Sequence, residues 1–171
     1  KNYLSPYLAE QIDGTMQRVW EKLTPEKKEL LRLLSRFEIN SKQAKMIYDQ
    51  ANHAKYNLKF NNQDIIENPY LIFELTRHTP NPVSFLSVDH GIFPDPFIRN
   101  KHPLPDPSRV SSELDWRRLR ALIVDVLEKA TYEGHTLLPL KAVISKVDER
   151  KMDPPCDLNQ DILTAVEDDF D

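Results

Sequence analysis

Hydrophobic residues recur along most of the chain at three- and four-residue spacing, the period of an amphipathic α-helix. The first stripe follows Ser5-Pro6, where a capping hydroxyl precedes a proline at the first helical position. Its members are Leu8, Ile12, Met16, Val19, Trp20 and Leu23. Thr24-Pro25 repeats the same start signal. The chain is therefore expected to open with two consecutive helices.

The second of these helices buries leucines and faces water with basic residues. Its apolar positions are Leu30, Leu31, Leu34 and Phe37, and its polar positions are Lys27, Lys28, Arg32 and Arg36. Ser41 is expected to cap a third helix, with Ile47 and Tyr48 on its apolar face. Because so few residues separate the second and third helices, we expect them to form a helical hairpin.

Further helical turns are expected after Asn61-Asn62 and after Asn68-Pro69, with Tyr70 in the core. Seven prolines then fall between Pro80 and Pro107. Proline breaks helices and removes backbone donors, so this segment is interpreted as an ordered, extended wrap with one short helix capped by Asp95-Pro96.

The last third of the chain has the clearest helical pattern. A long helix is expected over residues 112–133, started by Ser112 and Asp115 and stopped by Gly134 in a left-handed conformation. Pro139 starts another helix, and residues 158–166 form the last. We therefore divide the chain into a helical-hairpin region (1–78), a proline-rich connector (79–110) and a helix-turn-helix-like unit (111–171).

Composition supports an all-α fold and a soluble, cytoplasmic protein. The 171 residues include three glycines, which argues against tight strand turns and against a glycine loop for phosphate. A lone cysteine, Cys156, suits a reducing compartment and is expected to be buried and inert. No apolar run approaches the roughly 20 residues of a membrane helix. Because the chain begins at Lys1 and ends in what reads as an unfinished helix, we interpret it as a fragment of a longer protein.

The net charge of −4 conceals a gradient along the chain. Residues 1–60 contain 11 Lys and Arg against 7 Asp and Glu, whereas residues 140–171 contain 4 against 9. If a phosphate backbone contacts this chain, the N-terminal third is the expected place. The alternative is an ordinary solvated helical surface.

Catalytic chemistry finds little support in the sequence. There is no Walker-type loop, so the fragment alone is not expected to hydrolyse nucleotides. The five histidines are far apart and the single cysteine has no partner, so no zinc site is expected. Asp89-His90 lacks a nucleophile in a suitable context, and an ordering hydrogen bond is the preferred interpretation.

Three stretches together resemble the region that precedes the motor core in RecD-like ATP-dependent DNA helicases. Residues 37–48 look like the family's degenerate helix-hairpin-helix, and residues 66–71 are similar to its glutamate-asparagine-proline-tyrosine element. Residues 118–122 with 133–139 are similar to its helix that ends in glycine-histidine and resumes at leucine-proline. The chain departs from the family at residues 82–95, where a glycine-rich second hairpin is usual, and at Asn40-Ser41.

The resemblance implies a non-catalytic accessory region that positions DNA or docks the motor core. ATP and Mg²⁺ would belong to the parent chain, with no cofactor in the fragment. The expected partners are single-stranded or forked DNA and the motor core of the same chain. The rival hypothesis is a protein-docking module with no DNA contact.

The candidate DNA contacts form three groups. A helix N-terminus at Ser41 presents backbone amides, and Lys42 and Lys45 add charge there. The remaining candidates lie at the start of the long helix or beside the proline-rich segment, and Arg120 can equally pair with acids of its own domain. They are Arg117, Arg118, Arg120, Arg99 and Lys101.

Overall fold

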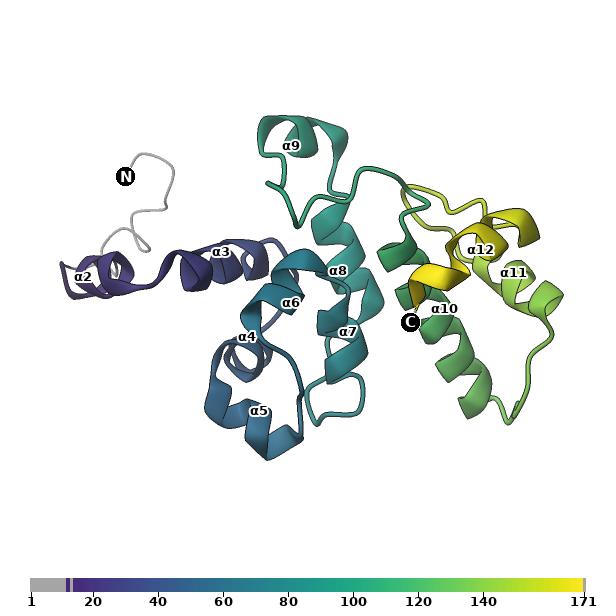
Figure 1. The fold of residues 1–171 in the computed structure, drawn as a ribbon, viewed down its shortest axis with the longest axis horizontal. Coiled ribbons are helices and arrows are strands. Elements are labelled where there is room, and N and C mark those ends of the chain that lie inside the picture. The colour runs from purple at the N-terminus through teal and green to yellow at the C-terminus, as the bar shows by residue number, and fades with distance from the viewer. Residues whose placement is uncertain (1–11, 13, 171) are drawn as a thin grey trace.

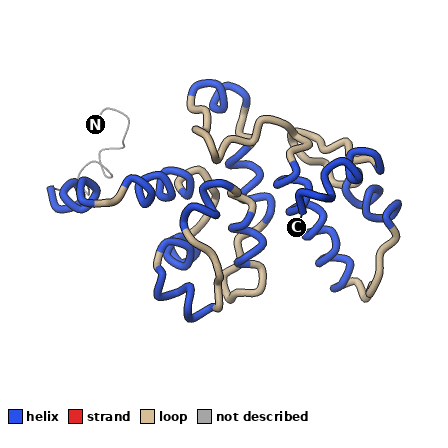
Figure 2. Tube along the Cα trace, in the orientation of Figure 1, coloured by secondary structure: helices blue, strands red, loops and turns tan. Residues whose placement is uncertain are grey.

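The computed structural model describes residue 12 and residues 14–170, and in this part of the chain it contains helices and no strand (Figures 1 and 2). The expected all-α fold is thus confirmed. The α-helices are α2 (Gly14–Lys22), α3 (Pro25–Leu34), α4 (Ser41–Tyr48), α5 (Gln50–Tyr56), α6 (Asn62–Glu67), α7 (Leu71–Thr76), α8 (Phe85–Ile92), α9 (Pro96–Lys101), α10 (Trp116–Tyr132), α11 (Leu140–Asp148) and α12 (Gln160–Val166). A 3₁₀ turn, η1 (Glu167–Phe170), follows α12.

Side-chain caps start α3, α6 and α9 where the sequence pattern puts them. Thr24 Oγ1 accepts a hydrogen bond from the Lys27 amide at the start of α3, as expected. Asn61 caps α6 in the same way. The start at Ser41 is corrected by one residue: Asn40 is the cap of α4, and Ser41 is its first helical residue. The predicted start at Ser5-Pro6 lies outside the described residues.

The helices α3, α4 and α6 form the N-terminal half of the core, with α3 packed against both of the others. Leu30, Leu33 and Leu34 of α3 are buried there, because their spacing keeps them on one side of the helix. By contrast, α2 has no buried residue and extends away from this cluster at one end of the molecule (Figure 1).

The proline-rich segment contains two helices rather than the single one expected. The predicted helix after Asp95-Pro96 is α9, but α8 forms where the proline count predicts extended chain. Ser84 caps α8, and its hydroxyl accepts a hydrogen bond from the Ser87 amide. The stretch between Pro82 and Pro94 is long enough for two helical turns, so counting prolines over the whole segment misses the gap between them.

Gly91 lets α8 pack closely against the turn that follows α3. A Cβ atom at this position would lie 2.4 Å from Cδ1 of Phe37 and 2.7 Å from the carbonyl oxygen of Arg36. Contacts that short do not occur around a real Cβ, so any side chain would force α8 away from this turn. The glycine is therefore required by packing.

The long helix α10 begins later than expected. Asp115, rather than Ser112, is its cap, and the Asp115 carboxylate accepts a hydrogen bond from the Arg117 amide. The helix ends as predicted before Gly134, whose φ of 90° is left-handed. The helix α10 contacts α7, α8 and α11.

A single buried cluster runs from α3 to the segment before α12. Residues from each of the three regions drawn from the sequence contribute to it, for example Ile47, Phe85 and Val126. The region boundaries themselves stay a prediction. In Figure 1, α2 lies at one end of the molecule and α11 and α12 at the other, with α8 and α10 between them.

Candidate nucleic-acid interface

The predicted contacts separate into cations that are used inside the fold and cations that remain at the surface. The first group consists of the three arginines of α10, and the second consists of Lys42, Lys45 and Lys101. Arg99 is half-buried and lies between the two groups.

Arg118 is part of a buried network and is inaccessible to DNA, which corrects the prediction for this residue. Its side chain is 0% exposed. Its Nε and Nη2 atoms donate to the two carboxylate oxygens of Asp89 at 2.8 and 2.9 Å. Nη1 donates to the carbonyl of Glu113, and Nη2 donates also to the carbonyl of Pro154. Asp89 accepts a further hydrogen bond from the Tyr70 hydroxyl at 2.6 Å.

The charges in this network compensate one another. Burial lowers the pKa of Arg118, but the hydrogen bond and negative charge of Asp89 outweigh it, so the net direction is upward. Burial, together with Asp89, raises the pKa of the Tyr70 hydroxyl well above its ordinary value. Tyr70 is accordingly a core residue, as expected from the sequence, and it stays neutral. The network joins α7, α8 and α10, so its role is structural.

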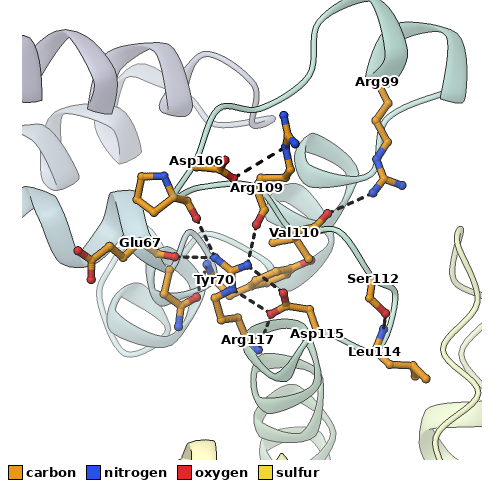
Figure 3. Close-up of polar contacts among 12 residues, drawn as sticks. Glu67, Tyr70, Arg99, Asp106, Arg109, Val110, Ser112, Leu114, Asp115 and Arg117 are labelled. Carbon is orange, nitrogen blue, oxygen red and sulfur yellow. Dashed lines mark hydrogen bonds and ion pairs between the residues drawn. The ribbon is translucent and has the colours of Figure 1, made fainter.

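The guanidinium of Arg117 is also hydrogen-bonded within the protein (Figure 3). Its guanidinium donates to both carboxylate oxygens of Asp115 at 2.9 Å. It donates in addition to the backbone carbonyls of Glu67 and Arg109 at 2.7 Å, and of Pro107 at 3.1 Å. All three guanidinium nitrogens therefore have acceptors within the protein, and the arginine ties the start of α10 to the end of α6 and the loop before α10. We correct the prediction of a phosphate contact here.

Arg120 pairs with an acid of the same chain, the alternative that the sequence left open. Its Nε lies 3.3 Å from the Glu74 carboxylate, and its Nη1 donates to the carbonyl of Phe170 at 2.5 Å. Burial raises the pKa of Glu74, although the positive charge of Arg120 acts in the opposite direction. The pair links α7 and α10 to the C-terminal 3₁₀ turn.

The start of α4 retains the predicted charge but not the predicted free amides. Asn40 Oδ1 accepts hydrogen bonds from the backbone amides of Lys42 and Gln43 at 2.9 and 3.0 Å. These two donors are thus already satisfied, which corrects the expectation that they are open to a phosphate at Ser41. The side chains of Ser41, Lys42 and Lys45 are exposed. Within the described residues, neither lysine ammonium has an acidic partner.

Lys42 and Lys45 line a small hollow of about 220 Å³. Asn52, Tyr56 and Asn81 contribute uncharged polar groups to it, and none of its lining residues is acidic. A hollow lined by two lysines and by neutral hydrogen-bonding side chains is suited to one phosphate.

The candidates on α9 are placed around two phenylalanines. Arg99 lies over the ring of Phe93 at 4.7 Å and donates from Nη2 to the carbonyl of Val110 at 3.1 Å (Figure 3 shows this bond). The ammonium of Lys101 is 5.8 Å from the centre of the Phe97 ring, which is 73% exposed. Lys101 is therefore free to meet a ligand from solvent, and Arg99 is partly so.

Sequence reasoning missed a second group of cations that the fold brings next to Arg99. Lys28 and Arg32 on α3, Arg36 in the turn after α3 and Arg109 in the loop before α10 line hollows that meet at Arg36. A signal was present, because residues 28, 32 and 36 recur every four positions and so form one stripe on the helix expected from the sequence. Their convergence with Arg99 and Arg109 depends on the tertiary structure.

Two observations concern metal binding and membrane spanning. In residues 14–170, no group of three or more His, Cys, Asp or Glu side chains is arranged to hold a metal ion. Over the same part of the chain, no helix combines the length and apolar character needed to cross a bilayer. Comparisons with protein-family models, curated proteins and solved structures yielded no significant match.

Proposed function

We propose that this chain is a non-catalytic DNA-binding region that positions DNA for a RecD-like ATP-dependent DNA helicase. The proposal combines the ordered resemblance of the three sequence stretches with one structural observation. That observation is the hollow at the start of α4, where Lys42 and Lys45 are exposed with no acidic residue in the lining. ATP and Mg²⁺ act in the motor core of the parent chain, which is the second partner of this region.

The binding is electrostatic and independent of base sequence. Two exposed ammonium groups attract phosphates as point charges and read no base edge. Contacts of this kind release counterions, so the affinity falls steeply as salt increases. Single-stranded or forked DNA is the expected ligand, because an accessory region ahead of a motor meets DNA that is being opened.

The test is the affinity of the chain for a labelled single-stranded oligonucleotide and for a labelled fork, measured by fluorescence anisotropy at several salt concentrations. Lys42→Glu/Lys45→Glu is expected to weaken binding of both. It should also reduce the slope of log K against log salt by about 1.4, which is about 0.7 for each phosphate that the variant no longer neutralises. The control is Lys141→Glu/Lys151→Glu, which changes the net charge equally at two exposed positions of the α11 region. An unchanged dissociation constant for the first variant at low salt contradicts a DNA contact at α4.

The helicase assignment has its own test in the neighbouring sequence of the gene product. We expect a glycine-lysine-threonine phosphate loop downstream of Asp171. A stop codon or a hydrolase domain there would contradict the assignment.

A docking module for another protein is the second candidate, and α2 favours it. Val19 and Trp20 of α2 are 58% and 39% exposed. With Leu23, Leu31 and Tyr48 they line an apolar hollow of about 330 Å³. Docking through such a surface responds weakly to salt, whereas binding to several phosphates responds strongly. The salt series described above therefore distinguishes the two functions.

A further inference from the structure

A groove runs between α3 and the loop that follows α9, and Arg36 divides it into two parts. The larger part, of about 790 Å³, lies between α3 and residues 102–108. The smaller part, of about 310 Å³, lies beside α9 and residues 109–111. Arg36, Pro103 and Leu104 line both parts, so the two hollows adjoin at these residues. We call this feature the α3–α9 groove.

The α3–α9 groove concentrates positive charge in a chain whose net charge is −4. Its lining contains five permanent cations and one acid, Glu29. The cations are Lys28, Arg32, Arg36, Arg99 and Arg109. Asp106 approaches Arg109 at 4.0 Å, but its side chain is 84% exposed and does not line the groove. A local excess of this size attracts an anion.

Arg36 at the centre of the groove lacks a counter-charge. Its Nη2 donates to the backbone carbonyls of His102 and Pro103, at 2.5 and 3.3 Å. Among the described residues, no carboxylate pairs with it. Burial without an acidic partner lowers the pKa of its guanidinium. This differs from Arg118, whose buried charge is balanced by Asp89, and it leaves a positive charge that a bound anion would neutralise.

One aromatic ring contacts a cation of the groove, and a second is exposed on α9, which borders the groove. The guanidinium of Arg32 is 5.9 Å from the centre of the Trp20 ring on α2. On α9, the exposed ring of Phe97 lies one helical turn from Asn100, a lining residue. Cationic grooves with exposed aromatic rings are typical of single-stranded nucleic-acid binding, because the phosphates follow the charge and the bases stack on the rings.

We propose that the α3–α9 groove binds the phosphate backbone of single-stranded DNA, with bases stacking on Trp20 and Phe97. This inference rests on the proposed function and adds a second contact to it, separate from Lys42 and Lys45. Four of the five cations are arginines, whose planar guanidinium groups match two phosphate oxygens at once. That geometry and the flanking rings favour a polynucleotide over an acidic peptide.

The test uses the intact chain and a labelled oligothymidylate. Arg32→Gln/Arg109→Gln removes two cations whose side chains are exposed. If phosphate binding ceases to contribute near 1 M salt, removing two cations is expected to weaken binding about 25-fold at 0.1 M salt and to lower the salt slope by about 1.4. Lys141→Gln/Lys151→Gln, with the same change in net charge, should bind within about twofold of wild type if long-range charge contributes little.

A second variant guards against an effect on folding. Arg109 Nε donates to the carbonyl of Leu104, so its replacement also removes a hydrogen bond within the loop. Lys28→Gln/Arg32→Gln leaves that hydrogen bond in place and should weaken binding to a similar extent. Thermal unfolding followed by circular dichroism establishes that each variant is folded. Wild-type affinity in both folded variants would overturn the proposal that the groove binds DNA.

The outcomes separate this inference from the proposed function. If only the α4 variant Lys42→Glu/Lys45→Glu loses affinity, DNA binding stands and the groove is wrong. If only the groove variants lose affinity, the groove is right and α4 is not a contact. Unchanged affinity in all of them overturns both. Poly-glutamate as an unlabelled competitor completes the set: displacement of the oligonucleotide at equal charge concentration would show an acidic-peptide site instead.

Discussion

The buried pair of Asp89 and Arg118 gives the sharpest prediction about stability. Asp89→Ala removes three hydrogen bonds, one from Tyr70 and two from Arg118. The guanidinium then remains in the core without a counter-charge, since the Asp89 and Arg118 side chains are 1% and 0% exposed. Breaking a buried pair on one side costs about 3–5 kcal/mol. This is a large part of the roughly 5–15 kcal/mol that stabilises a typical domain.

The matching double variant, Asp89→Leu/Arg118→Met, is expected to recover most of that stability. Removing both partners leaves no uncompensated charge, and apolar replacements of similar volume are often neutral or stabilising. Tyr70→Phe provides a graded comparison, because it removes one of the three hydrogen bonds and leaves the ion pair intact. It should cost about 1–3 kcal/mol.

Urea unfolding followed by far-UV circular dichroism measures these free energies. For a chain of this length, a loss of 3–5 kcal/mol lowers Tm by roughly 6–20 °C. The reasoning fails if Asp89→Ala unfolds within about 1 kcal/mol of wild type. It also fails if the loss of unfolding free energy in the double variant equals the sum of the losses in its two single variants. Such additivity would mean that an uncompensated buried charge is not the cause of the instability.

Two further predictions concern packing and the single thiol. Gly91→Ala should lower the free energy of unfolding by about 1–3 kcal/mol, because its Cβ would collide with Phe37 and the Arg36 carbonyl. Gly14→Ala is the control. Its Cβ would come no closer than 3.8 Å to another group, so unfolding measurements should show no such loss. Burial raises the pKa of the Cys156 thiol to about 11, so the folded chain should react slowly with a thiol reagent at pH 8 and rapidly in urea. The stability associated with this raised pKa is present below pH 9 and is lost as the pH rises towards 11. Equal labelling rates in buffer and urea, or a stable Gly91→Ala variant, would contradict these two accounts.

The sequence determined the features that depend on neighbouring residues. The caps at Thr24 and Asn61 and the left-handed stop at Gly134 follow from residue types whose preferences act within one helical turn. The burial of Tyr70 and of the Cys156 thiol was also predictable from the sequence, because large apolar side chains and free thiols are usually buried.

Only the tertiary structure decided what the charged residues do. The start of α10 has three arginines within four positions. No neighbouring residue indicates that Arg118 pairs with Asp89, which is 29 positions away. Likewise, the stripe of Lys28, Arg32 and Arg36 could face bulk water or a groove, and the loop after α9 makes it the wall of a groove. Helix formation depends on contacts between near neighbours in the chain, whereas the partner of a charge depends on which distant segments pack beside it.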